Sequence, residues 1–104
     1  MTENNPSHFI IIADLRSASI ARLEAEIVSL GTAQELAPQV WALRAARSLA
    51  TIRNTLMQKV GRSDTLFVVD ASHDRIMWLN CPPSTEARLK QIWNKELQSA
   101  DYLG

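Results

Sequence analysis

Apolar patterns of two different periods alternate along the chain, and their order limits the folds that it can adopt. Phe9-Ile10-Ile11-Ile12-Ala13 is a continuous β-branched and aromatic run, which is typical of a strand inside a sheet. Apolar residues then recur at helical spacing and predict one buried helix face, with a serine cap before it at Ser17 or Ser19. That face consists of Ile20, Leu23, Ile27 and Leu30.

The middle of the chain repeats this alternation. Strands are predicted around residues 33–36 and 40–43, with Pro38 between them, because proline cannot donate to a strand ladder and suits a turn. A second helix follows, with Ser48 as its cap and an apolar stripe of Leu49, Ile52, Leu56 and Val60. Gly31 and Gly61 are predicted to end the two helices, Gly31 in the left-handed conformation that glycine favours.

The last part of the chain predicts two strands and a helix. Leu66-Phe67-Val68-Val69 is an apolar strand, and Ile76-Met77-Trp78-Leu79 is expected to pair back on it as a hairpin. The Cys81-Pro82-Pro83 segment interrupts the chain. A final helix from Ser84 to Gln98 is predicted, with Ser84 as its cap and with an apolar face of Leu89, Ile92, Trp93 and Leu97.

This order predicts an α+β domain of the ferredoxin-like type, β-α-β-β-α-β, with helices on one face of an antiparallel sheet. Residues 1–7 are expected to form a loose tail, residues 8–80 the domain, and residues 84–98 a helix on this domain or on a partner. The second sheet face would be open, with Trp41 and Trp78 as candidates for it. An open apolar face favours binding to a second copy.

Composition narrows the classes of function. Eleven basic and eleven acidic residues cancel, so any attraction to nucleic acid must come from a local patch. The chain has one cysteine, and its longest apolar run is too short to cross a bilayer. We therefore expect a cytoplasmic protein without a membrane span.

Asp14 is the first candidate for chemistry. It follows an apolar strand and precedes a helix, which is where the sites of α/β proteins gather. A carboxylate there can bind Mg²⁺ or Mn²⁺, and a two-fold axis would bring a second Asp14. The alternative is that Asp14 caps the backbone of the following turn. Asp70, His73 and Asp74 are a weaker candidate for acid–base or metal chemistry, since their spacing also fits a solvated turn.

A positively charged stretch is the second candidate. Residues 39–63 contain five basic residues and no acidic one, which is unusual for a solvated helix. They can contact phosphates of DNA or RNA, or they can simply face solvent. These residues are Arg44, Arg47, Arg53, Lys59 and Arg62.

The chain resembles the small CRISPR-associated adaptation proteins that partner the integrase, together with their SinR-like and virulence-associated toxin relatives. The resemblance covers about His8 to Leu79. It rests on residues 9–15, Leu30-Gly31, residues 39–44 and residues 63–69, with the SinR-like group the nearest in pattern.

The resemblance implies a ferredoxin-like homodimer with a nucleic-acid-linked role in bacterial antiviral defence or in a toxin system. By resemblance, Asp14 occupies the position of an aspartate near the two-fold axis, which binds metal in the nucleases of the family. Arg16 stands where the family carries a basic cluster. Two functions are therefore expected: a metal-dependent nuclease with Asp14 as catalytic and metal-binding residue, or a non-enzymatic homodimeric adaptor for nucleic acid or a larger protein partner.

Overall fold

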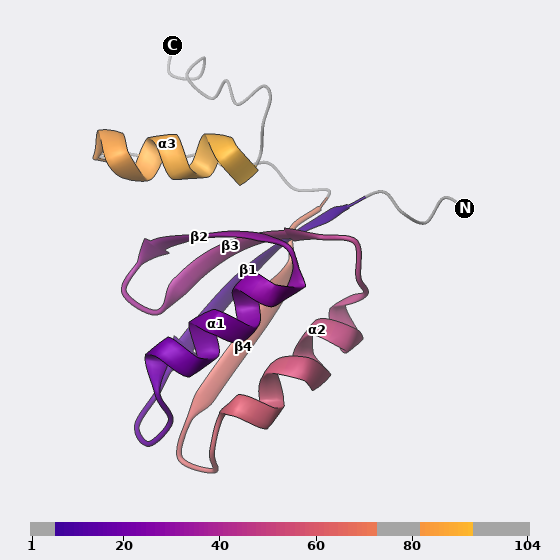
Figure 1. The fold of residues 1–104 in the computed structure, drawn as a ribbon, viewed down its shortest axis with the longest axis vertical. Helices are drawn as coiled ribbons and strands as arrows, with labels where there is room; N and C mark the ends of the chain where they lie inside the picture. The colour runs from indigo at the N-terminus through magenta and orange to yellow at the C-terminus, as the bar shows by residue number, and fades with distance from the viewer. Residues whose placement is uncertain (1–5, 73–81, 93–104) are drawn as a thin grey trace.

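In the computed structural model, which describes residues 6–72 and 82–92, the chain is an α+β domain of the ferredoxin-like type. The strands are β1 (Ser7–Asp14), β2 (Thr32–Ala37), β3 (Val40–Ala45) and β4 (Thr65–Asp70). The helices are α1 (Ile20–Leu30), α2 (Leu49–Leu56), the short 3₁₀ helix η2 (Met57–Lys59) and α3 (Pro83–Ile92). The predicted fold class is therefore confirmed (Figure 1).

The four strands form one antiparallel sheet in the order β2-β3-β1-β4. β1 is central, as its continuous apolar run predicted, and β2 and β4 are the edges within the described residues. α1 and α2 lie together on one face of the sheet (Figure 1). The predicted strand at residues 76–79, the His73-Asp74 turn and Trp78 lie outside the described residues.

The core lies between this sheet face and the two helices. Strand alternation turns Phe9, Ile11 and Ala13 of β1 toward the helices, and all three are buried. From α1 and α2, the buried side chains are Leu23, Ile27, Leu30, Ile52 and Leu56. Ile20 and Leu49, the first residues of the predicted stripes, are instead exposed because each stands at the first turn of its helix.

Trp41 corrects one expectation. It was a candidate for the open sheet face, but it is 1% exposed in the core beneath the helices. Its indole N–H donates to a Glu24 carboxylate oxygen at 3.3 Å, which satisfies the buried donor. The register explains its place, since Trp41 pairs with Ile11 and both side chains therefore share one face.

The helix ends also differ in part from the prediction. Ser48 caps α2 as expected, and of the two candidates Ser17 and Ser19 it is Ser19 that caps α1; they accept from the N–H groups of Thr51 and Arg22. Gly31 follows α1 but has φ 169°, which is extended rather than left-handed. Gly61 lies beyond η2, because α2 ends at Leu56 and tightens into the 3₁₀ turn.

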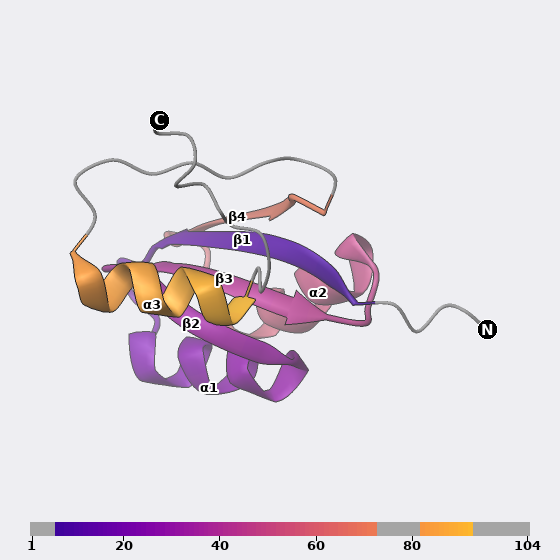
Figure 2. The ribbon, with the colours of Figure 1, turned by 90° about the horizontal axis from the view of Figure 1, so that it is seen from above.

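α3 covers part of the second sheet face. It packs on β2 and β3 opposite to α1 (Figure 2), and Leu89 and Ile92 are buried there together with Ala42. α3 begins at Pro83, and Ser84 is not its cap: proline fits the first helical position, and the Pro82 carbonyl accepts from the Glu86 N–H. The predicted extension of this helix from Trp93 to Gln98 lies outside the described residues.

Candidate functional site

Asp14 ends β1 on the sheet face opposite to α1 and α2. Strand alternation puts it on the same face as Ile12, and its backbone lies beside Thr65 of β4. The carboxylate is well exposed and forms an ion pair with the Arg16 guanidinium, 3.3 Å from Asp14 Oδ2 to Arg16 Nη2. The hydrogen bond from Arg16 to Asp14 and their mutual attraction raise the pKa of the Arg16 side chain.

Asp14 does not cap the β1–α1 loop within the described structure. That role belongs to Asp64, whose carboxylate accepts five hydrogen bonds: one from the Ser17 hydroxyl and four from backbone N–H groups. The N–H donors belong to Arg16, Ser17 and Ala18 in the loop and to Gly61 before β4, with 2.7 Å to Gly61 and 2.8 Å to Ser17. Asp64 therefore ties the β1–α1 loop to the η2–β4 loop, and Asp14 keeps its carboxylate on the surface.

Asp64 is held strongly in its charged form. The hydrogen bond from the Gly61 N–H, followed by that from the Ser17 N–H, lowers the pKa of its carboxyl well below the ordinary 3.8. A carboxylate whose oxygens already accept from the backbone has little capacity left for a metal ion. We therefore assign Asp64 a structural part in shaping the loop after Asp14.

Gln39 secures the same loop from the other side. Its carbonyl accepts from the Ala13 N–H at 3.0 Å, and its side-chain Oε1 accepts from the Leu15 N–H at 2.9 Å. Gln39 has φ 62° in the β2–β3 turn, directly after Pro38, a left-handed conformation uncommon for glutamine. Sequence reasoning missed both Gln39 and Asp64. For Gln39 a signal was available: it follows the turn proline Pro38, and the residue after proline in a turn commonly adopts a left-handed conformation.

Four of the five basic residues of the predicted stretch lie on or beside α2 and η2, as expected, and Arg44 lies apart from them in β3. Arg44 lies on the sheet face opposite to α2, and its guanidinium donates to the Ile92 carbonyl at 3.4 Å. Lys59 pairs with Glu26 of α1 at 3.9 Å, and Arg16 pairs with Asp14. Arg47, Arg53 and Arg62 remain exposed on or around α2.

The second acidic candidate was the group Asp70, His73 and Asp74, of which the structure describes Asp70, and there it forms a turn. The Asp70 carboxylate accepts from both the N–H and the hydroxyl of Ser72, at 3.0 and 2.6 Å, which is an Asx turn. The Ser72 hydroxyl oxygen in turn accepts from the His8 N–H at 3.0 Å. His73 and Asp74 lie outside the described residues.

A row of apolar side chains is the larger feature of the face that carries Asp14. Ile10 stands opposite Val69 and Ile12 opposite Phe67 in the β1–β4 ladder, so the four side chains form one block. Phe67 is 56% exposed, Val69 45% and Ile12 38%, whereas Ile10 is half-buried. We call this block the apolar patch. α3 covers β2 and β3 on this face and leaves the patch open.

Among the described residues, no three histidine, cysteine, aspartate or glutamate side chains come close enough to hold a metal ion together. Within the same ranges, no helix is both long and apolar enough to cross a membrane. Comparison with protein-family models, curated proteins and solved structures gave no match to this chain.

Proposed function

We propose that this protein is a non-enzymatic homodimeric adaptor, which joins a second copy through the apolar patch and holds a partner protein on its remaining surface. The observation that supports the proposal is the patch itself. It consists of four neighbouring apolar side chains on the two strands that α3 leaves uncovered. Small monomeric proteins seldom expose contiguous apolar surface of this kind without a partner for it.

A second copy fits the patch better than an unrelated surface does. A two-fold contact pairs the same patch on both subunits, so the apolar surface of one copy packs against the identical apolar surface of the other. Polar side chains on the same face, Asp14 and Arg44, would then lie outside the apolar centre, as in other protein interfaces. Residues of α3 beside the patch would extend the contact toward the area that stable dimers bury.

Phe67→Glu is expected to convert the dimer into a monomer, because it would put two like charges into the centre of an apolar contact. Light scattering at micromolar concentration should give about twice the chain mass of 11.6 kDa for the unmodified protein and the single chain mass for the variant.

The control is Val28→Glu on α1, which changes a side chain that is 53% exposed on the helix side of the domain. This variant should remain dimeric. A monomeric unmodified protein, or loss of the dimer in both variants, would contradict the proposed interface.

A metal-dependent nuclease is a second candidate, favoured by one observation. Asp14 is exposed, pairs with Arg16 but accepts no backbone N–H of the following loop in the described structure, and lies on the same face as the apolar patch. A dimer formed through that face would turn both Asp14 carboxylates toward the partner copy, where Mg²⁺ or Mn²⁺ with water and phosphate oxygens can complete a site. The isolation of Asp14 from other carboxylates within the described residues makes the adaptor our first proposal.

Asp14→Asn separates the two candidates. For a nuclease, cleavage of RNA or DNA with added Mg²⁺ or Mn²⁺ should fall by orders of magnitude in the variant, because both charges of the site are lost together. Glu86→Gln on α3 is the matched control and should cleave normally. The adaptor proposal expects no metal-dependent cleavage by any of the three proteins, so cleavage that depends on Asp14 would overturn it.

A further inference from the structure

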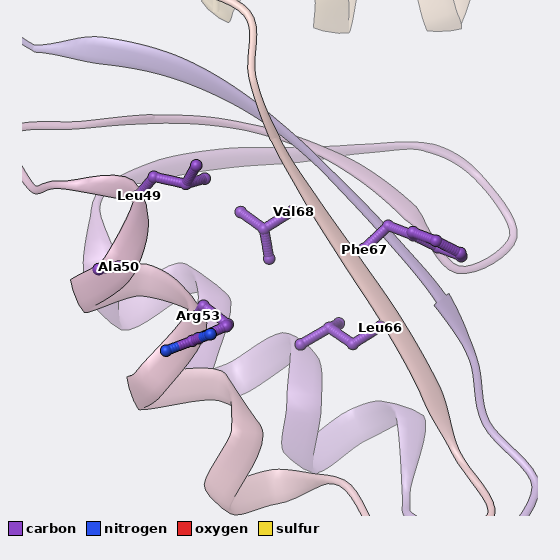
Figure 3. A pocket seen from close by; sticks show the side chains of 6 residues that line it. All are labelled: Leu49, Ala50, Arg53, Leu66, Phe67 and Val68. Carbon is purple, nitrogen blue, oxygen red and sulfur yellow. The ribbon is translucent and has the colours of Figure 1, made fainter.

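An apolar groove runs between α2 and the edge strand β4, on the opposite side of β4 from the apolar patch. It has a volume of about 370 Å³ and is lined by Leu49, Ala50, Arg53, Leu66, Phe67 and Val68. In Figure 3, Leu66 and Val68 point toward α2, whereas Phe67 points away across the strand. Leu66 and Val68 therefore belong to the groove alone, whereas Phe67 borders the groove and carries its ring on the side of the apolar patch.

Within the described residues, the backbone of β4 has hydrogen-bonding groups along this groove that pair with no other strand. The Ala71 N–H donates to the His8 carbonyl at 2.8 Å, so Ala71 turns its polar groups toward β1. In an antiparallel ladder this direction alternates, which turns Val69 and Phe67 toward β1 and turns Leu66 and Val68 outward. Leu66 and Val68 thus line the groove with their side chains and present their N–H and C=O groups at the sheet edge.

The two edges of the sheet differ in their protection. At the β2 edge, α3 packs alongside and the Arg88 guanidinium donates to the Glu35 carbonyl at 2.9 Å. Within the described residues, β4 pairs with β1 and with no strand on its other side. β4 also contains neither proline nor lysine, the residues that commonly prevent an edge from accepting another strand.

Charge distinguishes between the possible occupants of the groove. Arg53 lies at its rim, and its guanidinium contacts the neutral Asn54 side chain at 2.8 and 3.1 Å. No acidic residue occurs from Leu36 to Ser63, so the wall formed by α2 is positive. A second copy paired edge to edge in antiparallel fashion would put both α2 helices, each with its Arg53, on the same face of the joined sheet, and like charges disfavour that approach.

We propose that the β4 edge binds an extended segment of a partner protein as an additional strand, with apolar side chains in the groove and a carboxylate on Arg53. Main-chain bonds to Leu66 and Val68 would give the segment its affinity, and the groove and Arg53 would select its sequence. This inference rests on the proposed adaptor function and identifies the partner's class as a segment with alternating apolar residues and an acidic one.

The probe is the synthetic peptide Ser-Val-Thr-Val-Thr-Glu-Ser with blocked ends, whose two valines and glutamate fall on one face of a strand. Binding is measured by a nuclear magnetic resonance titration, in which the Leu66 and Val68 amides should shift most. Arg53→Glu in the protein, or lysine for glutamate in the peptide, should each weaken binding about tenfold or more. The two changes combined should restore it, and Arg62→Glu, a matched reversal beyond the groove, should leave it unchanged.

Backbone pairing is tested with the unmodified protein. Alternate N–H groups of the bound peptide point to opposite edges of its strand. N-methylation of those at the edge next to β4 removes the donors to β4, whereas N-methylation of those at the outer edge leaves these donors intact. One methylated peptide should lose binding and the other should keep it. Failure of the parent peptide to bind at millimolar concentration, equal binding of both methylated peptides, or no effect of charge would each overturn the inference.

Light scattering on the same samples separates the two proposals. A dimer that does not bind the peptide contradicts only the proposed strand binding at the groove, and a monomer that binds the peptide contradicts only the proposed dimer.

Discussion

Gly31→Ala is expected to destabilise the fold by about 3 kcal/mol, which is the upper range for a side chain forced into a packed site. Gly31 joins α1 to β2 and approaches the β3 backbone closely. A Cβ at this position would overlap the carbonyl oxygen of Arg44 and would lie 3.0 Å from the Ala45 Cβ. Because the obstacle is the backbone of the inner strand β3 where it pairs with the start of β2, neither partner can move without disturbing the β2–β3 pairing.

Thermal unfolding measures this effect, and a domain of this size should lose more than about 10 °C in Tm. Gly61→Ala is the matched control. Its Cβ would meet the Ser17 hydroxyl at 2.9 Å, and this exposed side chain can rotate away with the loss of one hydrogen bond to Asp64, so the variant should lose much less stability than Gly31→Ala. If Gly31→Ala unfolded at the temperature of the unmodified protein, the close approach between the end of α1 and β3 would be wrong.

Asp64→Asn is expected to loosen the β1–α1 loop and to lower the Tm by several degrees. Asparagine keeps the size of the side chain, but one of its two oxygens becomes a donor, so part of the set of four backbone N–H groups loses its acceptor. Amide hydrogen exchange should speed up at Arg16, Ser17, Ala18 and Gly61. Asp14→Asn is the control, because its exposed carboxylate has no such backbone donors in the described structure.

The contribution of Asp64 should also depend on pH. Its pKa is lower in the folded than in the unfolded chain, so in acid the unfolded state binds more protons and folding is weakened. The stabilisation is complete above the ordinary pKa of 3.8, declines as the pH falls below this value, and is lost once the pH passes the folded pKa. The unmodified protein should therefore lose stability on acidification more steeply than Asp64→Asn. Parallel pH profiles for the two proteins would refute the assigned hydrogen bonds.

The sequence was sufficient for the fold because its signals were local and repeated. The continuous run at residues 9–13 identified the central strand, Ser48 identified the start of α2, and the start of α1 was predicted to within two residues, at Ser17 or Ser19. Alternation could not say which face of β3 would be covered, since Trp41, Ala42 and Leu43 are all apolar and all buried. Only the register with β1 and the position of α3 decide that Trp41 faces the helices and Ala42 faces α3.

The candidate site was less accessible to sequence reasoning, because its decisive contacts join residues distant in the chain. Asp14 was correctly placed at the end of β1, but the loop after it is held by Gln39 and by Asp64, which is 47 positions from Ser17. No local sequence pattern predicts a hydrogen bond between residues so far apart in the chain. In the basic stretch, residues that are close in sequence lie apart in the fold. Arg44 belongs to β3 and Arg47 to the loop before α2, so their side chains lie on different surfaces.

The most direct test of the proposed dimer is an isotope-filtered nuclear Overhauser experiment on an equal mixture of labelled and unlabelled protein. Only contacts between copies give signals in such a sample. A dimer formed through the apolar patch should give signals between the Ile12, Phe67 and Val69 side chains of the two copies. Signals confined to α1 and α2, or the lack of any signal at concentrations well above micromolar, would contradict it.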